Sequence, residues 1–213
     1  LGRYAEAQQV LDSLKPDGTS PASLYSRIEQ ISLALDQGQF AQAREKAQQS
    51  IEIAQAADAR VLRKFQVMQQ LVAMVDDPRS VSLDALQQLA TAEQLELQQA
   101  LPHGRIESLM NLLAIALVAQ RSNHADFSGK VINAASPLVD ELGNPNLGKM
   151  MRLLQAQQLN YQGQVDEAIA ALQQELAKSQ STEMESRQEC DALRGDLAAL
   201  SQAYASLEVE YQQ

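Results

Sequence analysis

The sequence has no tryptophan, a single cysteine and few aromatic residues, which make up 4% of its 213 positions. One cysteine excludes a framework of disulfides within the chain and favours a reducing compartment, so we expect a cytoplasmic protein. Strands favour aromatic and β-branched residues, and the scarcity of aromatic residues argues against a sheet. Glycine and proline are also sparse, with nine and six residues, and most of them occur where we expect helices to end.

Basic residues and long apolar runs are lacking as well. The formal net charge is −10, whereas binding of nucleic acid needs a cationic surface, so no nucleic-acid partner is expected. The stretch that comes closest to a membrane span, residues 109–119, is shorter than the roughly 20 apolar residues that a span needs. It predicts a buried helix, and we expect no membrane contact in this fragment. Alanine, leucine and glutamine dominate instead, and because all three favour helices we predict an all-α protein.

A short motif recurs along the chain. It consists of a glycine, a large apolar residue two positions later and an alanine five positions after the glycine. The glycine can close one helix in a tight turn, the apolar residue can pack on the preceding helix, and the alanine allows close approach. Clear copies are Gly2/Tyr4/Ala7, Gly38/Phe40/Ala43 and Gly163/Val165/Ala168, and weaker copies occupy residues 80–85 and 123–128. The copies follow one another at intervals of about forty residues, the length of one helix hairpin in repeat proteins.

Proline and glycine between the motif copies mark further turns, at residues 15–18, 77–78, 101–104 and 143–146. Together these signals predict helices over residues 4–14, 22–37, 40–57, 59–76, 82–99, 105–121, 125–142 and 147–162, with a last helix that starts near 165. Pro137 falls inside the seventh of these helices and should kink or split it. The first residues already look like the middle of a repeat, so we expect the sequence to be a fragment of a longer protein.

The motif copies resemble the tetratricopeptide repeat family over residues 1 to about 178. The resemblance implies a superhelical solenoid of antiparallel helix pairs, with long, degenerate repeats like those of bacterial sensory and regulatory proteins. It also implies that a protein or peptide binds the concave face, which the first helix of each pair lines. Mapped on this sequence, that face comprises Tyr25, Ile28, Ser32, Leu35, Met110, Leu113, Leu117, Arg121, Met150, Leu153, Gln157 and Asn160. Such a mixed apolar and amide groove suits an extended peptide or an amphipathic helix.

Apolar residues of the C-terminal part recur at alternating intervals of four and three, which is the spacing of a coiled coil. Val165, Ile169, Leu172 and Leu176 begin this series, and we expect them to pack on the last repeat. After a polar interval at residues 179–186, the series resumes at Cys190, Leu193, Leu197, Leu200, Tyr204, Leu207 and Tyr211. These residues either form a coiled coil with a second chain or cap their own stack.

We therefore expect a repeat domain over residues 1–178 and a coiled-coil-like linker helix over residues 179–213 that makes the chain a homodimer. The linker is similar to the helices that precede output domains in bacterial signalling proteins, such as diguanylate cyclases or histidine kinases.

Residues suited to catalysis are scattered. His103 and His124 lie in expected turns and lack a partner at helical spacing, and Cys190 has no neighbouring base, so it is expected to be a small core residue. The carboxylate pairs at residues 76–77 and 140–141 lie at helix ends. No phosphate-binding, dinucleotide-binding or zinc-protease motif is present. We expect no enzyme, no metal and no cofactor.

The sequence thus favours a non-catalytic protein–protein interaction or sensory module of a larger bacterial signalling or regulatory protein, whose terminal helix couples dimerisation to an output domain. Two alternatives stay open: a stand-alone adaptor that binds a peptide in its concave groove, and a small-molecule sensor.

Overall fold

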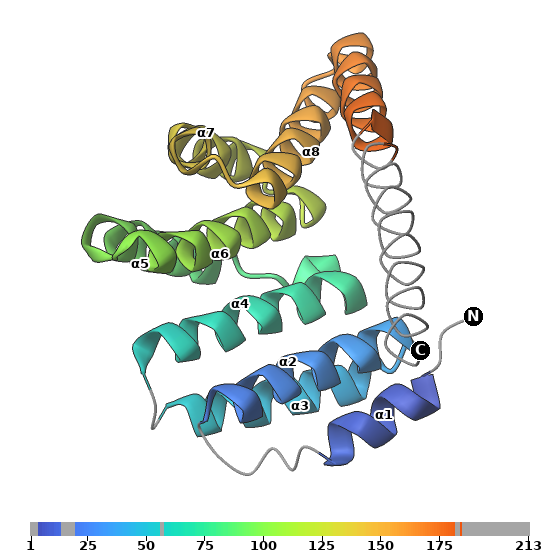
Figure 1. Ribbon diagram of the computed structural model, residues 1–213, viewed down its shortest axis with the longest axis vertical. Helices are drawn as coiled ribbons and strands as arrows, with labels where there is room; N and C mark the ends of the chain where they lie inside the picture. The colour runs from blue at the N-terminus through green and yellow to red at the C-terminus, as the bar shows by residue number, and fades with distance from the viewer. Residues whose placement is uncertain (1–3, 14–19, 56–57, 182–183, 185–213) are drawn as a thin grey trace, which may run out of the picture.

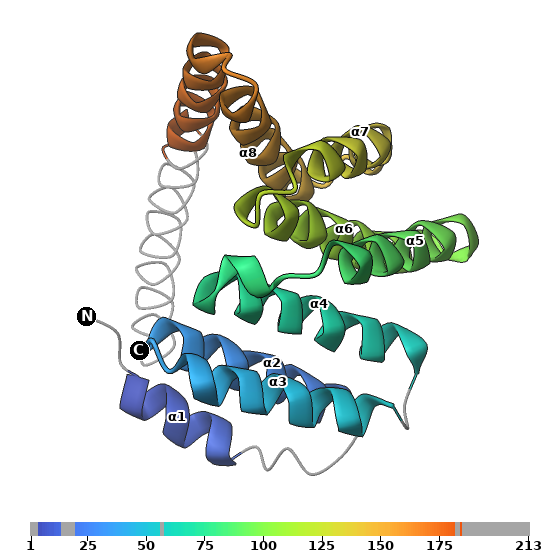
Figure 2. The ribbon, with the colours of Figure 1, turned by 180° about the vertical axis from the view of Figure 1, so that it is seen from behind.

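The computed structural model describes residues 4–13, 20–55, 58–181 and 184, and all regular structure within these ranges is helical. Figure 1 shows the helices following one another along the longest axis, from α1 at one end to residues 165–181 at the other, and Figure 2 shows the same order from behind. The elements are α1 (Tyr4–Ser13), α2 (Pro21–Asp36), α3 (Phe40–Ala54), α4 (Ala59–Asp76), the 3-10 helix η1 (Pro78–Ser80), α5 (Leu83–Gln99), α6 (Pro102–Arg121), α7 (Ala125–Leu142), α8 (Pro145–Tyr161) and a helix over 165–181. The prediction of an all-α protein is confirmed for this part of the chain.

Most helix ends fall within a few residues of the predicted ones, but two helices begin earlier than expected. α6 begins at Pro102 and α8 begins at Pro145, inside segments that were predicted to be turns. Proline is favourable at the first helical position, because its missing N–H would have no partner there and its φ angle is already helical. As a result, His103 belongs to the first turn of α6 and not to a turn between helices.

Three connections between helices use the same tight turn. Gly38 and Gly163 have positive φ angles of 71° and 80°, and Asn123, at the glycine position of a weaker motif copy, has a φ angle of 61°. Glycine and, at lower frequency, asparagine tolerate this left-handed conformation. In each turn the next residue donates its N–H to a carbonyl five residues back, which satisfies the end of the preceding helix. These bonds are Gln39 to Ala34 (2.8 Å), His124 to Ala119 (2.8 Å) and Gln164 to Leu159 (3.0 Å).

The small residue of the motif is buried in each of these three copies. Ala43, Ser128 and Ala168 are at most 4% exposed, and each lies in the first turns of the helix that follows. The weak copy at residues 80–85 is different, because its first residue, Ser80, ends η1 and the side chain of Ser82 caps α5. The motif therefore marks the same local structure in three connections and another structure in the fourth.

α7 is one helix that runs through Pro137, so the predicted split does not occur. Pro137 removes the hydrogen bond to the carbonyl of Asn133, and both residues lie on the exposed side of α7, where water can reach that oxygen. The opposite side carries the buried residues Val131, Ala135 and Val139, which hold the helix in place. The burial of these residues stabilises the helix more than the loss of one backbone hydrogen bond destabilises it.

The core consists of two clusters of buried residues that meet at α4. Ile31, Phe65 and Val72 belong to the cluster of α2, α3 and α4. Val67 of α4 belongs instead to the larger cluster, which α5 to α8 supply. Besides neighbours along the chain, contacts join α2 to α4, α4 to α6 and α6 to α8. The even-numbered helices thus form a continuous row.

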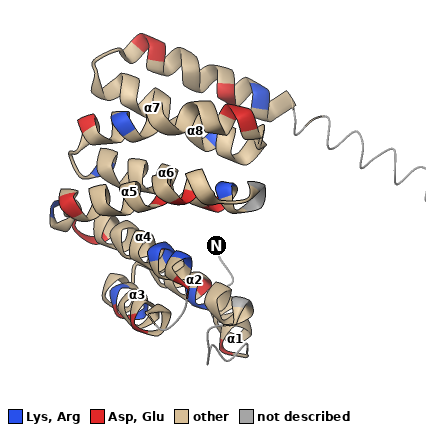
Figure 3. Ribbon diagram, turned by 90° about the vertical axis from the view of Figure 1, so that its left-hand side faces the viewer, with Lys and Arg blue, Asp and Glu red and all other residues tan. Residues whose placement is uncertain are grey.

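Charge is distributed unevenly between the two sets of helices (Figure 3). The even-numbered helices carry eight basic and four acidic residues, a net +4. The odd-numbered helices and residues 165–181 carry four basic and thirteen acidic residues, a net −9. Part of this difference serves ion pairs between an arginine on an even-numbered helix and a glutamate on the next helix. These pairs are Arg63–Glu93, Arg105–Glu141 and Arg152–Glu175.

Candidate binding groove

A groove of about 500 Å³ lies between α6, α8 and the helix over residues 165–181. Its lining is mainly apolar, with one charged residue and two amides. α6 contributes Leu113, Leu117 and Arg121; α8 contributes Met150, Leu153, Leu154, Ala156, Gln157 and Asn160; and the last helix contributes Val165, Ala168, Ile169 and Leu172. A ligand in the groove would therefore contact residues of three helices.

Seven of the twelve residues predicted for partner binding come together here. They are Leu113, Leu117, Arg121, Met150, Leu153, Gln157 and Asn160. They come from two helices that lie far apart in the sequence, and the contact between α6 and α8 brings them together. Their binding of a partner stays a prediction.

The other five predicted residues do not line this groove. Tyr25 is exposed on α2 with the ammonium of Lys64 5.2 Å from its ring centroid. Ile28 and Leu35 pack partly against the cluster of α2, α3 and α4, and the hydroxyl of Ser32 donates to the carbonyl of Ile28 (3.0 Å). Met110 is exposed on α6, outside the groove.

Three residues of the apolar series in the last helix, Val165, Ile169 and Leu172, line the groove beside residues of α8 and are only partly covered there. Val165, Ile169 and Leu172 are 45–48% exposed, and Leu176 is 59% exposed. The buried residues of this helix are Ala168 and Glu175. At roughly 100° per residue, these two lie about a quarter turn around the helix from the apolar series. The expected packing of this series on the last repeat is thus partial at Val165, Ile169 and Leu172.

An ion pair fastens the last helix to α8 and sets its rotation. Arg152 donates through Nε to Glu175 Oε2 and through Nη2 to Glu175 Oε1 (3.1 Å), and the glutamate side chain is 9% exposed. The hydrogen bonds from Arg152 lower the pKa of the Glu175 carboxyl against the opposing effect of burial, with smaller contributions from the charges of Arg152, Lys178 and Lys149. The same hydrogen bond raises the pKa of Arg152. The pair is therefore ionised at neutral pH.

Gln120 joins the end of α6 to α8 from within the core. Its side chain is fully buried, and Nε2 donates to the carbonyl of Leu154 (2.9 Å) and to Gln158 Oε1 (3.2 Å). This fixes the next residue, Arg121, beside the C-terminal part of α8, where Gln157 and Asn160 also line the groove. Arg121 is exposed, and its side chain forms no ion pair or hydrogen bond with the residues that the structure describes.

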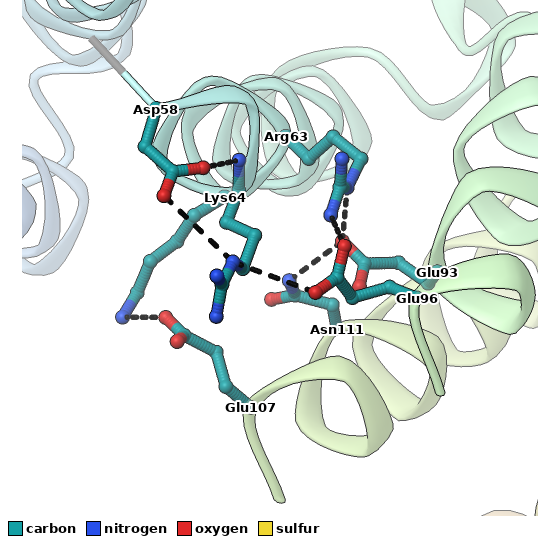
Figure 4. A network of polar contacts seen from close by, with 8 residues as sticks. Asp58, Arg63, Lys64, Glu93, Glu96, Glu107 and Asn111 are labelled. Atoms are coloured by element: carbon teal, nitrogen blue, oxygen red, sulfur yellow. Dashed lines mark hydrogen bonds and ion pairs between the residues drawn. The ribbon is translucent and has the colours of Figure 1, made fainter. Parts of the chain in front are cut away.

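A second polar cluster links α4, α5 and α6 on another part of the molecule (Figure 4). Glu93 is 1% exposed and accepts from Arg63 Nε (3.2 Å) and Asn111 Nδ2 (3.0 Å). Arg63 also donates to Glu96 (3.0 Å), and Lys64 pairs with Glu107 (2.9 Å) near the edge of the cluster. The cluster could not be predicted from the sequence, because its members lie on three helices and share no motif. Each of the three glutamates has a basic donor on a neighbouring helix, which makes the cluster a structural link between α4, α5 and α6.

The remaining candidates for chemistry lie apart from one another. Asp76 pairs with Arg44 (2.6 Å), and Asp77 and His124 stand at helix starts. Across the described ranges, no three His, Cys, Asp or Glu residues gather as a metal site would need. None of the helices in that part is both long and apolar enough to cross a bilayer. Cys190, Leu193, Leu197, Leu200, Tyr204, Leu207 and Tyr211, which were predicted to mediate dimerisation, lie outside the described residues.

Comparison of the chain with models of protein families, with curated proteins and with solved structures gives no match. The resemblance to the tetratricopeptide repeat family therefore rests on the motif copies in the sequence.

Proposed function

We propose that this chain is a non-catalytic binding module that accepts an apolar helical segment of a partner protein in the groove between α6, α8 and residues 165–181. One observation carries the proposal: Val165, Ile169 and Leu172 stand half-exposed along one wall of a preformed groove. Burial of a leucine-sized side chain contributes about 1.5–3 kcal/mol, so a partner that covers these residues gains affinity.

The proposed architecture is a tetratricopeptide-like solenoid of antiparallel helix pairs. Three features support it: the turn that recurs at Gly38, Asn123 and Gly163, the row of even-numbered helices, and the ion pairs between consecutive helices. In a solenoid each repeat contacts only its neighbours, so a binding surface can extend along one side. The groove would then be the C-terminal part of the concave face.

A helical ligand suits this groove better than an extended one. The residues that each helix contributes are three or four positions apart, for example Leu113, Leu117 and Arg121 on α6. Side chains at this spacing interdigitate with those of another helix, whereas a strand presents alternate residues and seeks an unpaired sheet edge.

A labelled amphipathic peptide of about two heptads, with leucine at the a and d positions and neutral residues elsewhere, tests the proposal. We expect saturable binding by fluorescence anisotropy to the full chain. Leu153→Gln should weaken this binding at least about tenfold, because it places an amide in an apolar contact. Leu153 is 43% exposed in the free protein, so the variant should keep its fold.

The matched control is Leu95→Gln, which changes a leucine of α5 that is 54% exposed and lies outside the groove. It should leave peptide binding unchanged. Equal losses in the two variants, or no binding by the unmodified chain, would contradict the proposed function.

A wider proposal concerns the larger protein. In this wider proposal the module is part of a bacterial signalling or regulatory protein. The apolar series of residues 190–211 forms a coiled-coil dimer, which connects the module to an output domain such as a diguanylate cyclase or histidine kinase. Its support is the spacing of that series in the sequence. A stand-alone adaptor would use the same groove without the dimer, and the mass of the chain in solution separates the two.

A small-molecule sensor is the second candidate, and the volume of the groove favours it. About 500 Å³ falls within the range of sites that hold small ligands. A screen of apolar metabolites by thermal shift tests this function, and a stabilising compound should lose its effect in Leu153→Gln but not in Leu95→Gln.

A further inference from the structure

The groove has a polar end whose chemistry is complementary to a carboxylate. Arg121 is the only charged residue among those that line the groove, and Gln157 and Asn160 are the only amides. Gln120 anchors this part of α6 to Leu154 and Gln158 of α8. Asn160 and Val165 flank the turn at Gly163, so the N-terminus of the last helix lies at the same end.

Arg121 differs from the arginines that hold the helices together. Arg63, Arg105 and Arg152 each pair with a glutamate on the next helix. Arg121 has no such partner among the described residues, although its side chain stands beside an apolar groove. A guanidinium offers five N–H donors in a planar fork that matches a carboxylate. The ion pairs that join neighbouring helices therefore do not explain why a charged residue stands at position 121.

We propose that the occupant of the groove is an acidic amphipathic helix of a partner protein, with a glutamate or aspartate that pairs with Arg121 and leucine-like residues that cover the apolar walls. This inference rests on the proposed function and adds the charge of the partner. The even-numbered helices, which form the row containing two walls of the groove, are net basic in a chain whose overall charge is −10. An acidic side chain of the ligand is thus attracted to the walls that α6 and α8 supply, whereas the third wall, over residues 165–181, carries three acidic residues and one basic residue and repels it.

Three peptides that share the leucine series test the inference. They carry glutamate, glutamine or lysine at one terminal position of the series and are otherwise identical. We expect the glutamate peptide to bind the full chain about tenfold more tightly than the lysine peptide, because a charge-assisted hydrogen bond forms in one complex and like charges meet in the other. The difference should shrink as salt is raised, since Arg121 is exposed.

Charge reversal at Arg121 is the most discriminating variant for this experiment. Arg121→Glu should invert the preference, so that the lysine peptide binds more tightly than the glutamate peptide. Lys149→Glu is the control, because Lys149 is an exposed cation of α8 outside the groove lining. It should lower affinity for the glutamate peptide slightly and leave the order of the three peptides intact.

The outcomes separate this inference from the proposed function. If the three peptides bind equally and Leu153→Gln still abolishes their binding, the inference of an acidic partner is overturned but the groove remains a binding site. No binding of any peptide would overturn both.

Two other occupants give their own results. A dimer that Leu172→Glu dissociates would place a second copy of the chain in the groove. Peptide affinity that rises when Leu200 and Leu207 are changed to glutamate would mean that residues 190–211 compete for it. Either result would overturn the proposal that a helix of a partner protein occupies the groove.

Discussion

At the scale of single residues, one buried carboxylate joins three helices. Glu93 of α5 accepts from Arg63 of α4 and from Asn111 of α6, at the place where the two core clusters meet. A buried charge of this kind is costly in isolation and becomes tolerable only when every partner is present. The cluster therefore fixes how α4 sits against α5 and α6 more than it adds net stability.

Removal of this carboxylate should destabilise the protein strongly. We expect Glu93→Ala to lower the free energy of unfolding by about 3–5 kcal/mol, because Arg63 and Asn111 lose a buried acceptor. Urea unfolding followed by circular dichroism measures the change. Glu107→Gln, in the more exposed pair with Lys64, should cost less than about 1 kcal/mol. A small loss for Glu93→Ala would show that water enters and replaces the carboxylate.

At the scale of elements, the repeated turn and the last helix show two different controls on helix position. The turns at Gly38, Asn123 and Gly163 are local, since backbone angles and two or three hydrogen bonds define them. The rotation of the last helix depends on Arg152 and Glu175, which are separated by the turn and meet only after the chain reverses. The first feature can be inferred from the sequence and the second cannot.

A side chain at Gly163 should strain the turn between α8 and the last helix. Gly163→Ala is expected to cost about 1–2 kcal/mol, because an alanine at a φ angle of 80° brings Cβ close to the following carbonyl. Gly163→Asn should cost less, since asparagine already occupies the equivalent position at Asn123. Thermal unfolding of the two variants tests this order, and equal losses would speak against a strained left-handed residue.

The ion pair of the last helix should respond to acid. The pKa of Glu175 is lower in the folded protein than in the unfolded chain, so the pair stabilises the fold fully above the unfolded pKa. That stabilisation should be lost as pH falls through the folded pKa. We expect the unfolding free energies of the unmodified chain and Glu175→Gln to differ at neutral pH and to converge in acid. A difference that is constant with pH would mean that the glutamate contributes through packing alone.

At the scale of the whole molecule, the even-numbered helices pack into a row, and within the described ranges the groove wall over residues 165–172 is only half covered. Each core cluster is built from helices that are near in sequence, and α4 contributes to both. The spacing of Val165, Ile169 and Leu172 resumes at Cys190 in the sequence. In the proposal, groove binding and self-association therefore use different parts of one apolar series.

If the series at residues 190–211 forms a coiled coil, the chain should be a dimer in solution. We expect multi-angle light scattering to give twice the chain mass of 23.3 kDa. Leu200→Glu combined with Leu207→Glu should give a monomer, because a charge at a d position faces its copy in the partner helix. Leu95→Glu is a control that should stay dimeric. A monomer before any substitution would favour the stand-alone adaptor.

The helical class, most helix boundaries and the three turns could be predicted from the sequence, because helix propensity, proline at the first turn and left-handed residues act over a few positions. Seven of the twelve residues mapped for the concave face also line the groove, all of them on α6 and α8. Local patterns do not show that Pro137 stays within α7, that Glu93 is buried in a three-helix cluster, or that Val165, Ile169 and Leu172 line a groove. Burial, and the rotation of one helix against another, depend on contacts between residues distant in sequence, which no local pattern records.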